Sequence, residues 1–301
     1  MGYSGRYHAA SLAAVFLALA IGILIGVGLG HNVIPAARKD LEQSLKSDLS
    51  DARGRADTLQ GQLNQERGFS DQVFPALVGG LLRGERVAVV ALGGLPENMK
   101  GDIESVVGAD NPTGAELGEV AIVREPPDRR ALASAAAQGT PARTLARNPD
   151  ALPGVARRMG QALVTGQKPF FRFRGAMLSR ISGHPGNIAA VIVVRSRPAD
   201  LNASRSAATD SLEGGLLDGL ERAGRTPVVG VERSDTTGSS IGFFDAQGAP
   251  STVDSIDLAS GRVALAYALD GAQGNYGVKS TADRLLPTLR SPAGSPASAQ
   301  R

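Results

Sequence analysis

The sequence of 301 residues contains no cysteine and no tryptophan, and aromatic side chains make up only 4% of it. Without cysteine the chain has no disulfide framework, no cysteine nucleophile, no thiolate metal ligand and no cysteine to carry a lipid. An excess of one charge is also lacking, because 32 Lys and Arg stand against 29 Asp and Glu. Nucleic-acid-binding domains gather basic residues on one face, so this near balance argues against a nucleic-acid partner.

The motifs of common enzymes are missing as well. The sequence contains no GxxxxGK[ST] phosphate loop, no GxSxG nucleophile elbow and no HExxH metal motif. Gly93-Gly94 lacks the third glycine of a dinucleotide-binding turn, and His184 lies in a turn-like sequence typical of a surface loop. The spacing of Asp254 and Asp257 does not separate acid–base chemistry from simple solvation. We therefore predict that the chain is not an enzyme and has no catalytic, cofactor-binding or metal-binding residues.

One long hydrophobic run is present near the N-terminus. No Asp, Glu, Lys or Arg occurs between Arg6 and Arg38, and the 22 residues 9–30 are almost entirely apolar. As a helix they extend roughly 33 Å, enough to cross a ~30 Å hydrocarbon core. The alternative is a cleaved signal peptide, whose apolar core is usually ~7–15 residues long. We predict an uncleaved transmembrane helix over 9–30, with residues 1–8 cytoplasmic and the bulk of the chain extracytoplasmic.

Small residues recur at every fourth position of this segment. On a helix they form one stripe along which two backbones can approach closely. A dimerising transmembrane helix is one interpretation, and chance in an Ala- and Gly-rich segment is the other. The stripe consists of Ala10, Ala14, Ala18, Gly22, Gly26 and Gly30.

A polar helical stretch is predicted over residues 38–67, after a break at Pro35. Its apolar residues alternate in steps of four and three, as in the seam of a coiled coil. We therefore predict a coiled-coil stalk and a homodimer, with a single solvated helix as the alternative. The seam consists of Leu45, Leu49, Ala52, Ala56, Leu59 and Leu63.

Residues 69–290 are predicted to form a Rossmann-like α/β domain outside the membrane, followed by a disordered tail over 291–301. Apolar runs alternate here with helical patterns, which is typical of a largely parallel sheet covered by helices. Strands are expected at 86–92, 119–123, 189–194, 226–231 and 262–269. Helices are expected at 96–107, 129–137, 152–165 and 209–223.

The segment Lys168-Pro-Phe-Phe-Arg-Phe-Arg174 combines three Phe with three cations. As a strand it would place Phe171 and Phe173 on one face and Arg172 and Arg174 on the other. An edge strand with one face in the core is one interpretation. The other is a surface for a partner protein or an anionic envelope polymer.

Three parts of the sequence resemble the actinobacterial MctB family, the mycobacterial copper transport protein B group. They are the start of the chain (residues 6–26), the segment Gly261-Arg-Val-Ala-Leu-Ala-Tyr-Ala-Leu269, and the pair Gly274-Asn-Tyr-Gly277 and Leu285-Leu-Pro287. The resemblance implies a membrane-anchored envelope protein that acts in copper efflux or copper homeostasis. SteB-like members of the group imply an alternative, a scaffold that binds a cell-division protein partner through its coiled coil and regulates a peptidoglycan hydrolase.

The residue types do not favour direct handling of copper by this chain. Cu(I) prefers thiolate or thioether ligands, and Cu(II) prefers imidazoles. The chain has no Cys and no pair of His within one helical turn or strand. Copper therefore enters the prediction through the resemblance alone, and the residues indicate an anchored interaction module. The four methionines are Met1, Met99, Met159 and Met177.

Overall fold

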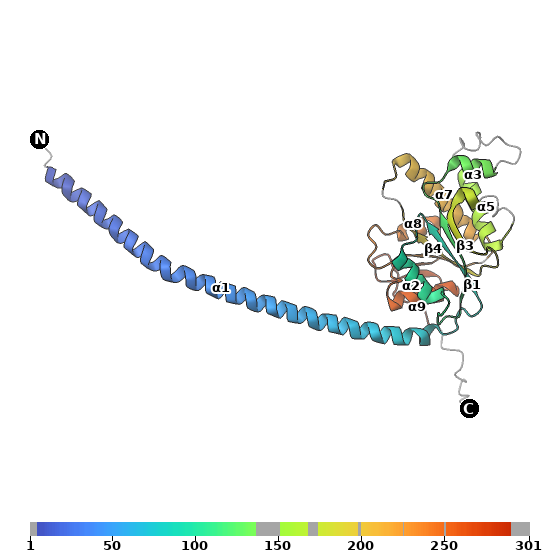
Figure 1. The fold of residues 1–301 in the computed structure, drawn as a ribbon, viewed down its shortest axis with the longest axis horizontal. Helices are drawn as coiled ribbons and strands as arrows, with labels where there is room; N and C mark the ends of the chain where they lie inside the picture. Colours follow the sequence, from blue (N-terminus) through green and yellow to red (C-terminus); the bar gives the residue numbers. More distant parts are fainter. Residues whose placement is uncertain are drawn as a thin grey trace, which may run out of the picture. The chain divides into compact units, whose positions relative to one another are not determined.

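The computed structural model describes residues 5–136, 151–167, 174–197, 200–224, 226–249 and 251–289. The chain divides into two compact units, Met1–Glu66 and Arg67–Arg301. The first unit consists of helix α1, and the second is an α/β domain that also includes the last turns of α1 (Figure 1). Phe171, Arg172, Phe173 and the tail 291–301 lie outside the described residues.

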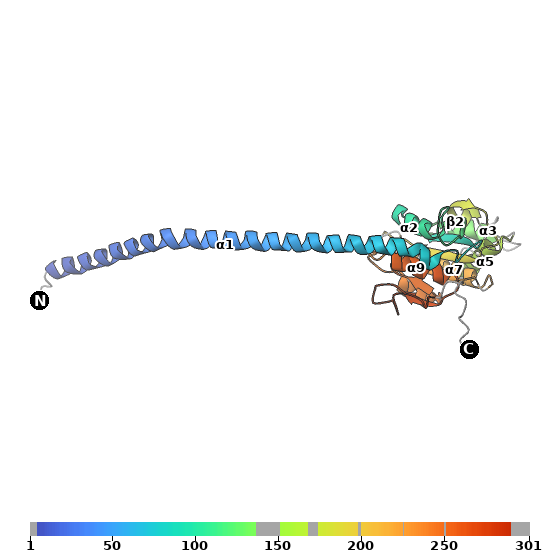
Figure 2. The ribbon, with the colours of Figure 1, turned by 90° about the horizontal axis from the view of Figure 1, so that it is seen from below.

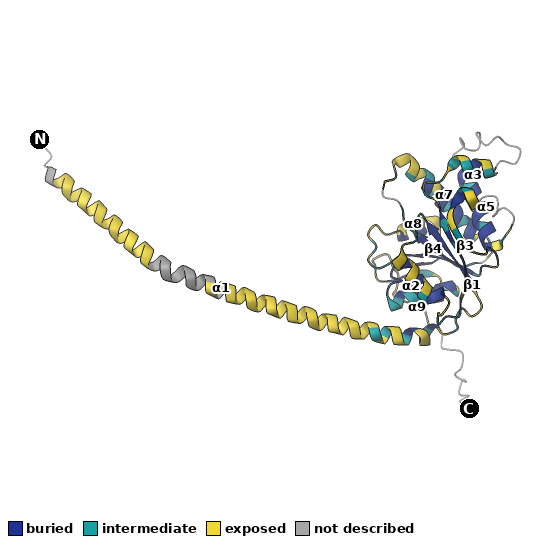
Figure 3. Ribbon diagram, in the orientation of Figure 1, coloured by how far each residue is buried: buried dark blue, intermediate teal, exposed yellow. Residues whose placement is uncertain are grey.

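Helix α1 (Gly5–Val78) is continuous over 74 residues, so the predicted break at Pro35 is wrong. A proline inside a helix removes one backbone hydrogen bond at a cost of ~3 kcal/mol. The many Ala, Leu, Gln and Glu residues on either side favour the helix strongly enough to continue it. Within α1, Tyr7–Gly28 is long and apolar enough to cross a membrane. The described side chains of the first unit are exposed in the single chain (Figure 3).

A seven-stranded sheet forms the centre of the second unit, with strand order β3-β2-β1-β4-β5-β6-β7. Neighbouring strands are parallel except β2 and β3, which are antiparallel. The predicted α/β class with a largely parallel sheet is therefore confirmed. The strands are β1 (Arg86–Leu92), β2 (Glu116–Val123), β3 (Leu178–Gly183), β4 (Ala190–Arg195), β5 (Val228–Val231), β6 (Ser251–Val253) and β7 (Gly274–Tyr276).

Helices cover both faces of the sheet (Figures 1 and 2). On one face α2, α9 and the last turns of α1 pack against Val89 and Ile192, and on the other α3, α5, α7 and α8 pack against Val90 and Val193. Successive strand residues point to opposite faces, so each central strand contributes to two hydrophobic cores. The helices are α2 (Glu97–Val107), α3 (Arg129–Ala136), α5 (Ala151–Thr165), α7 (Ala203–Glu221), α8 (Ile241–Gln247) and α9 (Ala259–Leu269).

The prediction of a strand over 262–269 is wrong, because these residues form most of helix α9. All residues from Val263 to Leu269 are buried, so the helix shows no polar face from which a helical period could be read. A short apolar run of this kind fits a buried strand and a buried helix equally well. The alternating alanines, Ala264, Ala266 and Ala268, favour the helix, since alanine has the highest helix propensity.

Candidate functional site

The winding of the chain reverses between β1 and β4. From β1 the chain proceeds to β2 on one side, whereas from β4 it proceeds through β5, β6 and β7 on the other. In open α/β sheets, ligands bind outside the carboxyl ends of the strands at such a reversal. The carboxyl edge of this sheet is therefore the candidate functional site.

Charged residues that follow or end β2 and β4 lie beside the middle of α7. Arg195 donates to Glu213, with Nη2 2.8 Å and Nε 3.1 Å from Oε2. Oδ1 of Asp210 lies 3.0 Å from Nη2 of Arg195 and 2.9 Å from Nη1 of Arg197. These contacts join the end of β4 to α7 through charge-assisted hydrogen bonds. We call the group the switch-point cluster, and it consists of Glu125, Arg195, Arg197, Asp210 and Glu213.

Glu125 stands apart within the switch-point cluster. Its two carboxyl oxygens are shielded from solvent, and its carboxyl group lies within hydrogen-bonding reach of that of Glu213. Burial raises the pKa of Glu125 well above its usual range, and the adjacent Glu213 raises it further against the opposing effect of Arg195. Glu125 is therefore protonated at neutral pH. Gly93 allows this packing, because a Cβ there would lie 2.8 Å from a Glu125 carboxyl oxygen.

A second cluster lies at the carboxyl ends of β5, β6 and β7. Glu232 accepts hydrogen bonds from the Ser239 hydroxyl and the Ser240 amide, both at 2.7 Å, and from the ammonium of Lys279. Lys279 also donates to the backbone carbonyl oxygen of Arg233 at 2.9 Å. Glu232 is buried and fully satisfied, so this ion pair stabilises the loops around it.

Two aspartates tie the same loops to one another. Asp254 accepts hydrogen bonds from the amides of Val278 (2.8 Å) and Lys279 (3.0 Å), and Asp257 accepts from the amide (2.7 Å) and hydroxyl (2.6 Å) of Ser234. Burial by itself raises the pKa of Asp257, but the hydrogen bonds from Ser234 outweigh it and hold the pKa below its ordinary value. Both carboxylates are used in loop structure, which the spacing in the sequence did not reveal.

The described residues offer few candidate ligands for a metal ion. Among them, no three His, Asp or Glu side chains lie together as metal ligands. Met99, Met159 and Met177 are buried in the hydrophobic cores, with exposed fractions of 6%, 0% and 1%. His184 is exposed just after β3, in agreement with the predicted surface loop. The described residues therefore do not fit a copper site of thioether or imidazole type.

The other predicted site residues lie in separate parts of the chain, and the structure does not bring them together into one site. The described residues of the small-residue stripe are exposed on α1, among them Ala14, Ala18, Gly22 and Gly26. The exposure of Gly30 lies outside what the structure describes. A Cβ at Gly22 or Gly26 would have no neighbour within 4 Å. Arg174 is exposed within the helical residues 174–177 that precede β3. The seam residues are also exposed in the single chain: Leu45, Leu49, Ala52, Ala56, Leu59 and Leu63.

Comparison with known families identifies the group to which this arrangement belongs. The family described as "Copper transport outer membrane protein, MctB" matches residues 3–287, which include the apolar helix and all strands and helices of the described α/β domain. The chain belongs to the MctB family. The family description is that of a transport protein of the envelope rather than an enzyme, and the candidate transmembrane helix fits a membrane protein.

Curated relatives named for the same family match a smaller part of the chain. The proteins named "Copper transporter MctB" from Mycobacterium tuberculosis (strain H37Rv) and Mycobacterium bovis are 28% identical over 120 residues. That match covers 40% of this chain and 38% of the length of each relative. No solved structure matches the chain.

Proposed function

We propose that this chain is a single-pass envelope protein that acts in copper efflux or copper homeostasis. The observation that carries the proposal is the extent of the family match, because residues 3–287 take in both the candidate membrane span Tyr7–Gly28 and the α/β domain. Both parts therefore fall within one family match, and the curated relatives, which match 40% of the chain, are named as copper transporters.

In this proposal the chain acts as an anchored interaction module. Residues 1–8 lie in the cytoplasm, 38–67 form a coiled-coil stalk, and 69–290 form a Rossmann-like domain outside the membrane. Support for a homodimer comes from the exposed seam, since Leu45 and Leu59 are each 59% exposed in the single chain. Apolar seams of this kind are covered by a second helix in coiled coils.

The chain would contribute to copper transport through a partner that supplies the metal ligands. Support comes from the buried thioethers of Met99, Met159 and Met177 and from the isolated position of His184. The switch-point cluster, with its reversal of strand order, offers a polar edge for that partner or its ligand.

The copper role is tested by the growth of cells of the source organism that lack the chain. We expect growth to stop at a lower external copper concentration than in the parent strain, with recovery when the full chain is restored. Zinc serves as the matched control metal and should inhibit both strains equally. Equal sensitivity of the two strains to copper would contradict the proposal.

The absence of cysteine allows a direct test of orientation. A single cysteine introduced as Ser47→Cys or Ser4→Cys can be labelled in intact cells with a maleimide that does not cross membranes. We expect labelling of the Ser47→Cys chain only, because residue 47 lies in the stalk and residue 4 in the cytoplasmic segment. Labelling only at residue 4 would reverse the proposed orientation.

A further inference from the structure

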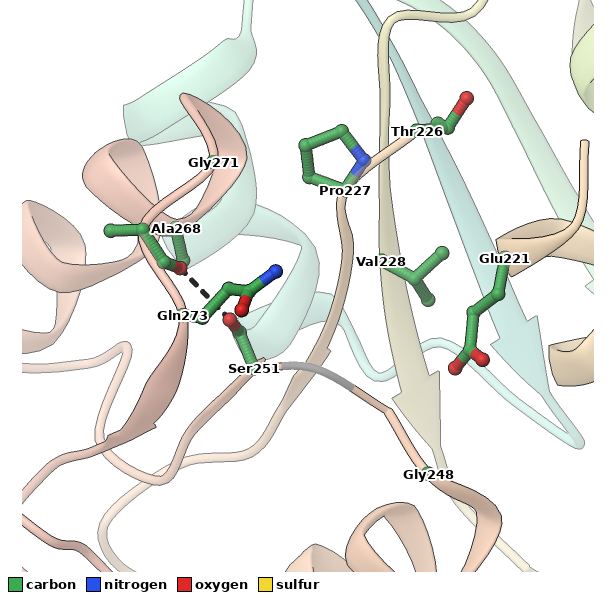
Figure 4. A pocket seen from close by; sticks show the side chains of 10 residues that line it. Glu221, Thr226, Pro227, Val228, Gly248, Ser251, Ala268, Gly271 and Gln273 are labelled. Carbon is green, nitrogen blue, oxygen red and sulfur yellow. Dashed lines mark hydrogen bonds between the residues drawn. The ribbon is translucent and has the colours of Figure 1, made fainter. Parts of the chain in front are cut away.

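A cavity of 420 Å³ lies at the amino-terminal edge of the sheet, on the side away from the switch-point cluster. It is formed where α7, α8 and α9 end and where β5, β6 and β7 begin. Figure 4 shows Glu221 and Val228 on one side of it and Ala268, Gln273 and Ser251 on the other. A volume of this size suits a small organic molecule.

Two of the residues that line the cavity, Thr226 and Ser251, carry hydroxyl groups that already donate elsewhere. The Thr226 hydroxyl already donates to the carbonyl oxygen of Gly224 at 3.1 Å, and the Ser251 hydroxyl donates to that of Ala272 at 2.9 Å. A hydroxyl group has one proton and two lone pairs, so both groups retain only their acceptor function. A ligand that satisfies them must therefore bring hydrogen-bond donors.

Glu221 supplies a negative charge in the same place. Its Oε1 is shielded from solvent and has no hydrogen-bond partner among the described residues. Burial raises the pKa of Glu221 to about 7, with a further rise from Asp218 and an opposing effect from Arg222. Glu221 is half-buried, and a shielded carboxylate oxygen without a partner carries a desolvation cost that a bound cation would remove.

The helix ends add to this negative potential. Helix α7 ends at Glu221, and α9 ends at Leu269, just before the cavity residue Gly271. The carboxyl end of a helix carries a partial negative charge that stabilises cations. Pro227, Val228 and Ala268 supply apolar walls next to these charges.

We propose that this cavity binds a small organic cation that carries N–H donors on an apolar body, with Glu221 as its counter-ion. A metal ion fits less well, because Glu221 is the only carboxylate among the described residues that line the cavity. This site is separate from the proposed role in copper transport and does not depend on it.

The test uses the full chain in detergent and cyclohexylammonium as the probe, with binding measured by calorimetry. We expect saturable binding of one probe per chain that weakens at least about tenfold in Glu221→Gln, which removes the charge and keeps the shape. The matched control Glu97→Gln changes an exposed glutamate of α2 and should bind like the wild type. Neutral cyclohexanol should bind at least about tenfold more weakly than the cation.

A second measurement on the unmodified chain covers the case in which the variant fails to fold. Cyclohexylammonium remains charged at both pH 5.5 and pH 8, whereas the Glu221 carboxylate is lost below a pKa of about 7. Binding should therefore be several-fold tighter at pH 8 than at pH 5.5. No saturable binding at pH 8, equal binding by cyclohexanol, or equal binding by Glu221→Gln would overturn the proposal.

Discussion

The guanidinium of Arg262 in α9 lies over the ring of Phe74 in α1, with its central carbon 5.1 Å from the ring centre. The same side chain pairs with Asp71, and the hydroxyl of Tyr267 lies 3.3 Å from the backbone carbonyl oxygen of Leu77. Phe74 itself is only 5% exposed. These contacts fix the last turns of α1 to the α/β domain.

Loss of Arg262 should loosen these turns. In Arg262→Ala the cation–π contact and the ion pair are both removed, and we expect a loss of about 1 kcal/mol of local stability. Hydrogen exchange of the amides of residues 70–78 should become roughly five-fold faster. The control Arg205→Ala changes an exposed arginine of α7 and should leave this exchange unchanged. Unaltered protection in Arg262→Ala would show that the contact does not anchor the helix.

The strands that could be predicted were those with long apolar runs. The bounds of β1 agree with the prediction, and β4 and β5 begin one or two residues later than expected. The three-residue strands β6 and β7 are too short for a pattern, and β3 is mostly polar because it lies at the sheet edge. Helix α7 begins six residues before the predicted start, at a cap where Asn202 accepts the amide of Arg205 at 3.0 Å. That N-cap was readable in the sequence.

The clusters at the carboxyl edge could not be predicted, because their members come from separate elements. Arg195 and Glu213 lie 18 residues apart, and Glu232 and Lys279 lie 47 apart. One signal was available, since Arg195 and Glu232 each end or follow an apolar run. The carboxyl ends of parallel strands meet at one edge, so charges in these positions are expected to gather.

Gly277 should be intolerant of any side chain. It has a φ of 146°, and a Cβ there would lie 1.8 Å from the Asp254 carboxylate that holds the following two amides. We expect Gly277→Ala to lower the free energy of unfolding by about 3 kcal/mol, measured by urea denaturation. Gly242→Ala, at an exposed helical position with no neighbour within 4 Å, should be neutral or slightly stabilising. Equal stability of the two variants would contradict this account of Gly277.

Glu119 should make stability depend on pH. It is 1% exposed, its oxygens have no partner among the described residues, and burial raises its pKa to about 7 against the opposing effects of Arg174 and Arg86. The unfolded chain loses this proton near 4.5, the ordinary pKa of a glutamate, whereas the folded chain keeps it until about 7. The folded state is therefore favoured below pH 4.5, and that advantage is lost as the pH rises to 7 and beyond.

Replacement of Glu119 by Gln should remove this effect. Above pH 8 we expect Glu119→Gln to be more stable than the wild type by about 1 kcal/mol or more, with little difference near pH 4.5. Denaturation curves at pH 4.5, 6 and 8 measure the difference, and Glu116→Gln, on an exposed residue of the same strand, is the control. A constant difference across this pH range would argue against a titrating buried carboxyl.

The exposed seam of α1 predicts a dimer in which that seam is covered. The full chain in detergent should sediment as a dimer. The double variant Leu49→Asp, Leu59→Asp should be a monomer, because each substitution would bury two like charges, one from each helix, against one another in the seam. The control pair Ser47→Asp and Thr58→Asp adds the same charge on the outward side of the helix and should leave the dimer intact. A monomer for the wild type would contradict the predicted stalk.

The proposed copper role is tested most directly by the copper content of cells, measured by elemental mass spectrometry over a range of external copper concentrations. Cells that lack the chain should contain more copper than the parent strain, and the full chain should restore the parental content. A chain without the span Tyr7–Gly28 should fail to restore it, because the domain would no longer be held at the membrane. Equal copper content with and without the chain would contradict the account, and an accompanying defect in cell division would favour the scaffold alternative.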